Sequence, residues 1–252
     1  MNATTDKTSS PAPAPRRRLG ILQAGRSPDA LLDRFPDYNR MFVDLLGEGA
    51  FDYLHWPVLD GVFPDSVDDA DAWLITGSRF GAYEDHDWIP PLEAFIRKVY
   101  ASGKPMVGIC FGHQVIAQAL GGKVEKFSGG WSVGRVEYDL DKSVFGTPES
   151  VSNDSPGLMA FHQDQVVELP AEAKNVGSSH FCKHAALLYG NRILTIQPHP
   201  EFDGRFVQGL METRGELLPT DVKPRAAETL EQPIAQGRIA ETLRQFLSRQ
   251  NA

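Results

Sequence analysis

The sequence predicts an α/β protein with a mostly parallel central sheet, helices on both faces, and a small antiparallel extension. Two observations lead to this prediction. Up to about residue 120, short apolar runs alternate with segments whose apolar residues recur at helical spacing, as in parallel strands joined by crossover helices. After that point, short strand-like runs follow one another with few helical segments between them, a pattern typical of antiparallel pairing.

The first half divides into alternating candidate strands and helices. The expected strands are residues 19–23, 51–56, 72–76 and 106–109. The expected helices are residues 38–46, 88–101 and 115–120, with a short further helix within 64–69. Ligands bind outside the carboxyl ends of the strands in sheets of this kind. Gly77, Ser78 and Cys110 follow two of the expected strands, so we expect them to lie at the ligand-binding edge.

The second half is expected to be mainly strands, closed by a helix. The expected strands are residues 123–127, 132–138, 165–168, 175–179, 185–189 and 192–196, and the expected helices are 202–211 and 234–247. Residues 217–233 read as a connection with one short helical piece. Because we find no internal repeat, we expect residues 19–252 to form a single domain after a disordered tail, residues 1–18.

Composition narrows the function and the compartment. The net charge of −8 argues against general nucleic-acid binding, which favours a basic face. Two cysteines make no disulfide framework, so a reducing cytoplasm is the expected location. No apolar run approaches the roughly 20 residues of a membrane span, and the N-terminus lacks the apolar core of a secretory signal. We therefore expect neither nucleic acid nor membrane as a partner.

Cys110 stands in a Gly-Ile-Cys-Phe-Gly stretch between an apolar run and a helix-like run. Strand, sharp turn and helix are the context of a nucleophile elbow, in which glycines allow a tight bend and the residue at the tip is exposed. The positive end of the following helix favours the thiolate form of a cysteine at that tip. Taken alone, the stretch fits equally well a buried structural cysteine at a tight junction.

His199 and Glu201 follow the last expected strand, separated by Pro200. The proline favours an extended conformation at His199. A base at a strand end with an acid two residues further on suits a catalytic triad, in which the acid orients the imidazole and stabilises its charged form. A turn histidine and a solvated carboxylate are the alternatives for each residue taken singly.

Residues 108–114 (Gly-Ile-Cys-Phe-Gly-His-Gln) and 197–201 (Gln-Pro-His-Pro-Glu) together resemble the class I, triad-type glutamine amidotransferase family. More narrowly, they are similar to stand-alone proteins that look like the glutaminase domain of GMP synthase. The resemblance spans roughly residues 19–210. It implies the flavodoxin-like fold of that family, with Cys110, His199 and Glu201 as catalytic triad. It also implies hydrolysis of a γ-carboxamide through a γ-glutamyl thioester, without cofactor or metal.

The resemblance also implies residues that surround the triad. The backbone N–H of Phe111 and a donor in the Gly77-Ser78 turn would form the oxyanion hole, although that turn alone could simply end a strand. Gln114 lies one helical turn after Cys110 and would contact the glutamine moiety; otherwise it is a surface amide.

Three further residues, His162, Gln163 and Asp164, would line the amino-acid end of the pocket, with Asp164 as a partner for an α-ammonium group. In residues 129–134 the backbone would approach the substrate, although a structural turn is nearly as good an interpretation. The alternating His180, Cys182 and His184 could suggest a metal site. We expect no metal there, because no fourth ligand can be placed.

The expected activity is cysteine-dependent hydrolysis of glutamine or a γ-glutamyl compound. About 40 residues follow the glutaminase-like region, fewer than the roughly 100 of a typical second domain, and the sequence contains no P-loop. Three roles stay open. The chain could supply ammonia to a separate synthetase subunit, act as a γ-glutamyl peptidase on glutathione-like conjugates, or bind γ-glutamyl compounds without catalysis. The complete triad disfavours the last.

Overall fold

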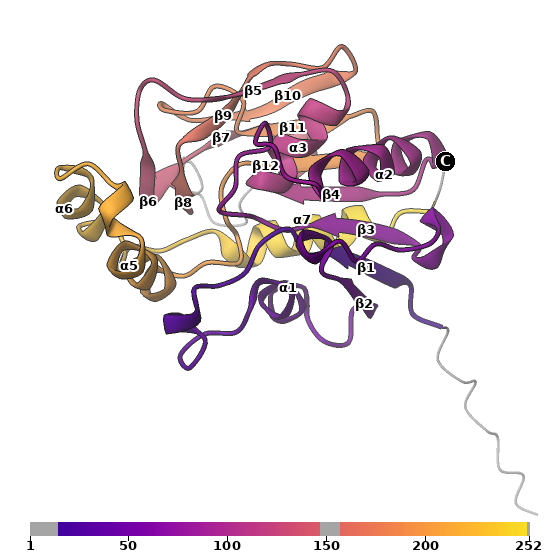
Figure 1. Ribbon diagram of the computed structural model, residues 1–252, viewed down its shortest axis with the longest axis horizontal. Helices are drawn as coiled ribbons and strands as arrows, with labels where there is room; N and C mark the ends of the chain where they lie inside the picture. Colours follow the sequence, from indigo (N-terminus) through magenta and orange to yellow (C-terminus); the bar gives the residue numbers. More distant parts are fainter. Residues whose placement is uncertain (1–14, 147–156, 251–252) are drawn as a thin grey trace, which may run out of the picture.

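A computed structural model describes residues 15–146 and 157–250 of the chain (Figure 1). Most of the tail expected at residues 1–18 therefore lies outside the described residues. The first strand begins at Arg18, one residue earlier than expected, where the Arg18 backbone N–H donates to the Asp71 carboxylate at 2.8 Å. Within these ranges, the structure contains no helix with the length and apolar character that a membrane crossing requires.

One sheet of eight strands forms the centre of the molecule. Its strands are β1 (Arg18–Leu22), β2 (Asp52–Trp56), β3 (Ala72–Ile75), β4 (Met106–Ile109), β7 (Asp139–Leu140), β10 (Ala173–Ser178), β11 (Ala186–Tyr189) and β12 (Ile193–Ile196). In the order β2-β1-β3-β4-β12-β11-β10-β7, the pairs from β2 to β12 are parallel and the rest antiparallel. The predicted fold class is confirmed.

Helices cover both faces of this sheet. On one face lie α1 (Tyr38–Leu46) and α7 (Gln236–Leu247), and on the other α2 (Ile89–Ser102) and α3 (Phe111–Ala119) (Figure 1). Successive side chains of a strand point to opposite faces, so each strand serves two cores. In β1, Ile21 packs in the core with α1 and α7, whereas Leu22 packs in the core with α2 and α3. All residues of β3, β4 and β12 are buried, which explains their continuous apolar character.

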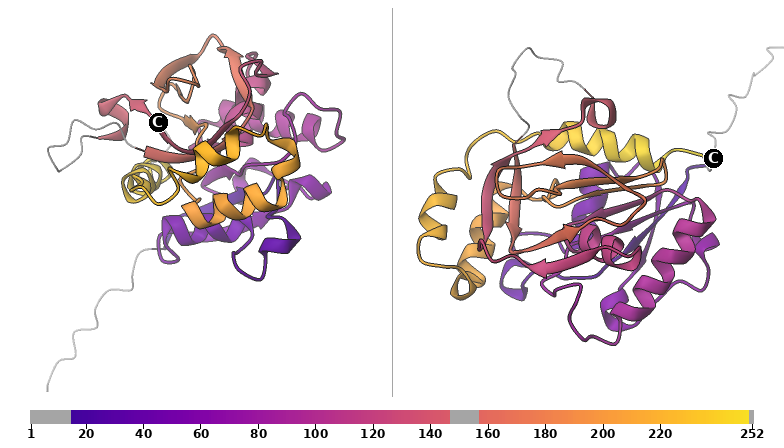
Figure 2. Two further views of the ribbon diagram at one scale, coloured as in Figure 1. Left: turned by 90° about the vertical axis from the view of Figure 1, so that its left-hand side faces the viewer. Right: turned by 90° about the horizontal axis from the view of Figure 1, so that it is seen from above.

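Two small antiparallel pairs, which follow α3 in the chain, form separate two-stranded sheets. One joins β5 (Lys123–Lys126) to β9 (Asp164–Glu168), and the other joins β6 (Ser132–Glu137) to β8 (Gly157–His162). Against β6 and β8 pack α5 (Gly204–Thr213) and α6 (Val222–Ala227), which form a third core at one end of the molecule (Figure 2). Sequence reasoning did not predict β7, β8 or the short helix α4 (Lys142–Phe145).

Single-turn helices occupy several connections: η1 (Asp29–Leu31), η2 (Val58–Asp60), η3 (Val67–Asp69) and η4 (Gly215–Leu217). The short helix expected within residues 64–69 is η3, which Ser66 and Asp69 close with a reciprocal capping box.

The carboxyl ends of β3, β4 and β12 meet at one edge of the sheet, because these strands are parallel neighbours. The segments that follow them carry Gly77 and Ser78, Cys110, and His199, respectively. Strand pairing thus brings together residues that are up to 122 positions apart in the sequence, Gly77 and His199 being the most distant.

Candidate active site

Cys110 occupies the tip of a sharp turn between β4 and α3. Its φ is 51° and its ψ is −100°, and it is the one non-glycine residue with positive φ in the described ranges. Such a conformation is strained for a residue with a side chain and persists only when its surroundings enforce it. Here the backbone N–H donates to the Ile196 carbonyl at 2.9 Å, and the Cys110 carbonyl accepts from the Gln114 N–H at 3.0 Å.

Two glycines make this turn possible. A Cβ on Gly108 would lie 2.5 Å from the Gly112 carbonyl oxygen, and a Cβ on Gly112 would overlap the Ile75 carbonyl group. The strand, the turn and the first turn of α3 therefore approach more closely than larger residues would allow. The predicted nucleophile elbow has the geometry that its glycine spacing indicated.

His199 and Glu201 form a buried pair next to this turn. The His199 Nδ1 lies 2.7 Å from the Glu201 Oε1, and the two side chains are 5% and 1% exposed. The imidazole stacks on the Phe202 ring with centroids 4.0 Å apart, and the His199 backbone N–H donates to the Met159 carbonyl at 2.8 Å. Contacts to the ring face, to the backbone N–H and to Nδ1 therefore fix the position of the His199 side chain.

Electrostatics favour a charged imidazole at this position. Burial by itself lowers the pKa of His199, but the negative charges of Glu201 and of the Cys110 thiolate oppose burial and raise the pKa overall. A raised pKa means that His199 readily keeps a proton beside the Cys110 sulfur. Its positive charge would stabilise a thiolate formed there, the reactive form of a cysteine nucleophile.

The loop after β3 passes directly against this pair. A Cβ on Gly77 would lie 2.9 Å from His199 Cε1 and 3.8 Å from the Cys110 Cβ. No hydrogen bond within the described residues uses the backbone N–H of Gly77, Ser78 or Phe111. These N–H groups are the ones expected to form an oxyanion hole, and in this structure they are available as donors.

Cys110 opens into a pocket of about 220 Å³. The structure brings all four residues expected to bind substrate into its lining: Gln114, His162, Gln163 and Asp164. Trp131, from the segment expected to approach the substrate, lines it as well. The Gln114 Nε2 donates to the Asp164 carbonyl at 2.8 Å, so this amide group also holds the pocket wall together.

A carboxylate marks one end of this pocket. The Tyr83 hydroxyl donates to Asp164 Oδ1 at 3.1 Å, and burial raises the pKa of Asp164. The positive charge of Lys126, which also lines the pocket, opposes this rise. Beside it, burial and the nearby charge of His199 lower the pKa of His162 to about 3, so His162 is neutral near pH 7. A partly buried carboxylate is a suitable partner for a ligand's ammonium group.

Sequence reasoning assigned no role to Gln197, which the structure places against the nucleophile. Its Nε2 lies 3.5 Å from the Cys110 Sγ, and its Oε1 accepts from Gln114 Nε2 at 3.1 Å. Gln197 stood within the quoted motif, so its proximity to His199 was the available signal. Tyr83 and Arg214, which also line the Cys110 pocket, gave no signal in the sequence.

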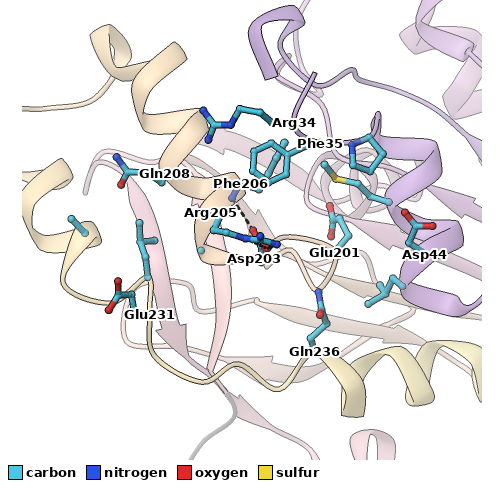
Figure 3. A pocket seen from close by; sticks show the side chains of 16 residues that line it. Arg34, Phe35, Asp44, Glu201, Asp203, Arg205, Phe206, Gln208, Glu231 and Gln236 are labelled. Carbon is cyan, nitrogen blue, oxygen red and sulfur yellow. Dashed lines mark hydrogen bonds and ion pairs between the residues drawn. The ribbon is translucent and has the colours of Figure 1, made fainter. Parts of the chain in front are cut away.

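A cavity larger than the Cys110 pocket lies elsewhere. It measures about 1150 Å³, is lined by Glu201 together with residues of α1 and α5, and shares no lining residue with the Cys110 pocket. Figure 3 shows Glu201 in its wall, near Asp44 and Gln236. Glu201 Oε2 has no hydrogen-bond partner within the described part of the chain. Because this cavity does not reach Cys110, it is not the place where an acyl group would bind.

The His180, Cys182 and His184 segment does not assemble a metal site. Cys182 is buried in the core, and burial raises the pKa of its thiol to about 12. Over residues 15–146 and 157–250, no cluster of three or more His, Cys, Asp or Glu side chains is arranged to hold a metal ion.

A strained cysteine beside a buried histidine–carboxylate pair, at the carboxyl edge of a mostly parallel sheet, places the chain among α/β proteins with a nucleophile elbow. The profile of the family described as glutamine amidotransferase class-I matches residues 67–209. The chain belongs to the class I glutamine amidotransferase family, as the sequence motifs predicted.

Individual proteins support this assignment. The chain is 29% identical to gamma-glutamyl peptidase 5 of Arabidopsis thaliana, over 86% of this chain and 89% of that protein. It is 34% identical to a glutamine-hydrolyzing GMP synthase of an Azoarcus strain, over 51% of this chain and 25% of that protein. A crystal structure of a glutamine amidotransferase from Thermotoga maritima has the same fold, with a TM-score of 0.73 over 93% of this chain and 99% of that one at 20% identity.

Proposed function

We propose that this protein hydrolyses the γ-amide bond of glutamine or of γ-glutamyl compounds through a thioester on Cys110. The observation that carries the proposal is the strained Cys110 beside the buried pair of His199 and Glu201. Class I family membership supports the same reaction type. This arrangement supplies a nucleophile, a base and a group that orients the base.

The proposed first half-reaction forms the thioester. Glu201 accepts the hydrogen bond of His199 Nδ1–H, which leaves Nε2 to take the thiol proton of Cys110. The thiolate attacks the γ-carbonyl carbon, and the oxyanion is held by backbone N–H groups of Phe111 and of the loop at Gly77. His199 then protonates the nitrogen of the leaving group as the C–N bond breaks.

The second half-reaction releases the acid. Neutral His199 takes a proton from water, the resulting hydroxide attacks the thioester carbonyl, and the C–S bond breaks to return the Cys110 thiolate. The proton stays on His199, which restores the thiolate–imidazolium pair that forms before the attack. Throughout, Asp164 would hold the α-ammonium group of the glutamyl moiety in the same pocket.

Between the two candidate substrates, we favour γ-glutamyl peptides. The observation is a second cavity, of about 1090 Å³, that adjoins the Cys110 pocket and offers room for a leaving group larger than ammonia. The name of the Arabidopsis relative, a gamma-glutamyl peptidase matched over most of both chains, agrees with this choice. The second candidate is a glutaminase that supplies ammonia to a separate synthetase; the similarity to part of a GMP synthase favours it.

The test compares ammonia release from glutamine with amine release from γ-glutamyl peptides, using the purified chain and its Cys110→Ala variant. We expect turnover of γ-glutamyl peptides that the variant loses by at least about 1000-fold. Faster turnover of glutamine than of any peptide would instead support the glutaminase. Equal rates for both proteins on every substrate would reject the hydrolytic function and leave a binding role.

A further inference from the structure

The Cys110 pocket and a neighbouring cavity share three lining side chains. Arg79, Phe80 and Arg214 line both the 220 Å³ pocket and the 1090 Å³ cavity. The larger cavity lies where β1, β2 and β3 end, with Arg26, Asp60 and Trp88 among its other lining residues. The three shared residues therefore lie where the pocket of the nucleophile borders the larger space, a place that we call the passage.

Arg79 and Arg214 are the charged residues that the Cys110 pocket shares with the larger cavity. Asp164, its partner Tyr83, Glu84 and Lys126 line the Cys110 pocket and do not line the larger cavity. Under the proposed function, the α-ammonium group of the substrate lies at Asp164. The γ-carbonyl must then reach Cys110, so the leaving group extends from Cys110 towards the two arginines.

These two arginines are not neutralised by the protein. Arg26 of the same cavity is paired with Asp60, but no carboxylate within residues 15–146 and 157–250 forms an ion pair with Arg79 or Arg214. The Arg79 guanidinium lies over the Phe80 ring, 4.7 Å from its centroid.

Arg214 is the more enclosed of the two arginines. It is half-buried, and its Nη2 donates to the Arg26 carbonyl at 3.5 Å. The acidic Asp29 and Asp87 line the larger cavity only, beyond the passage. A half-buried guanidinium without an anionic partner is a strong site for a carboxylate, because it offers paired donors in a partly desolvated place.

We infer that Arg79 and Arg214 bind a carboxylate of the leaving group. The protein then prefers γ-glutamyl amino acids or peptides with a free carboxylate over glutamine and over neutral γ-glutamyl amides. This inference rests on the proposed function and adds the substrate class. The carboxylate takes no part in the chemistry: the amide C–N bond breaks, the leaving amine receives the His199 proton, and the leaving group departs as an amino acid or a peptide.

The test uses two substrates that differ only in this charge, γ-glutamylglycine and γ-glutamylglycinamide. For the wild type we expect kcat/KM to be about 10- to 100-fold higher for the acid, the usual size of a charge-assisted interaction. Arg79→Gln and Arg214→Gln should each lower kcat/KM for the acid about tenfold, mainly through KM, and leave the amide unchanged. Arg214→Lys, which keeps the charge, should restore part of the loss.

Arg225→Gln is the matched control, because Arg225 is exposed, is paired with Asp221 and lines neither the passage nor the Cys110 pocket. Equal losses on acid and amide in the two passage variants would overturn the inference, since the arginines would then act on the glutamyl part or on folding. A wild type that does not distinguish acid from amide would overturn it as well. In both cases the Cys110-dependent activity would remain. Failure to hydrolyse either substrate or glutamine would reject the proposed function and this inference with it.

Discussion

At Gly77, the absence of a side chain keeps the loop after β3 in contact with the candidate nucleophile. A methyl group there would lie 2.9 Å from His199 Cε1, closer than Cβ atoms approach other atoms. His199 cannot move away easily, because Phe202 stacks on its ring. A small side chain at this one position should therefore disturb the site without unfolding the protein.

We predict that Gly77→Ala lowers kcat about 100-fold and changes the thermal midpoint little. The added methyl group displaces either His199 or the loop whose N–H groups face the reacting carbonyl, and one lost oxyanion donor typically costs about 100- to 1000-fold. The control is Gly237→Ala, in α7, where an added Cβ meets no atom within 4 Å. Equal activity of both variants would show that the loop at Gly77 has no part in catalysis.

Glu201 should control how readily Cys110 ionises. The negative charge of Glu201 helps to raise the pKa of His199, and the resulting imidazolium would stabilise a thiolate at Cys110. The substitution Glu201→Gln removes that negative charge. We predict that iodoacetamide alkylates Cys110 of the variant at least tenfold more slowly at pH 7, because His199 then carries less positive charge beside the sulfur. Cys182 should not interfere, because burial raises the pKa of its thiol to about 12.

The matched control for Glu201→Gln is Glu231→Gln, an exposed carboxylate in the wall of the same large cavity. Glu231→Gln should not change how the rate of Cys110 alkylation depends on pH. If Glu201→Gln does not change this dependence either, the buried pair does not control the reactivity of Cys110, and the proposed role of Glu201 is wrong.

Among the elements, α1 is held to the sheet by its N-cap. The Asp37 Oδ1 accepts the backbone N–H groups of Tyr38 and Ser27, each at 2.8 Å, and Oδ2 accepts Gln23 Nε2 at 2.8 Å. We predict that Asp37→Ala lowers the free energy of unfolding by about 2 kcal/mol, because a cap is lost and part-buried donors lose their acceptor. Urea denaturation measures this, with the exposed Asp33→Ala as control; similar values for both variants would contradict it.

The turn from β4 to α3 depends on the elements around it as much as on its own residues. Cys110 takes its strained conformation only because the Ile196 carbonyl in β12 and the Ile75 carbonyl in β3 border the turn on both sides. The elbow is thus a product of three adjacent strands. This explains why a short sequence stretch could indicate the turn but left the buried structural cysteine as an alternative.

For the whole molecule, we predict one cooperative unfolding transition. The central sheet is shared by the cores on its two faces, so neither core can be lost alone. Phe42→Ala, on α1 in the core that α7 shares, and Ile96→Ala, on α2 in the opposite core, should each lower the free energy of unfolding by about 2–5 kcal/mol and shift a single midpoint. Circular dichroism and tryptophan fluorescence should give coincident curves. Two separate transitions would show that the described chain is not one domain.

The sequence by itself determined the order and type of most elements and the three residues at the centre of the site. The helix α1 has the bounds that its apolar spacing predicted, Tyr38–Leu46, because an amphipathic period and the flanking Gly47 are local signals. The turn at Cys110 and the placement of His199 and Glu201 could likewise be predicted from the sequence, because each depends on particular residues within a few positions of one another.

Tertiary structure decided what depends on contacts between distant segments. The strand β8 carries no alternating pattern, because all its residues are buried between β6 and α5. The contact of Gln197 with Cys110 and the position of Arg214 beside the pocket arise from strand pairing and helix packing, which no local pattern encodes. The passage to the second cavity, and with it the proposed choice of leaving group, therefore became visible only once the chain was folded.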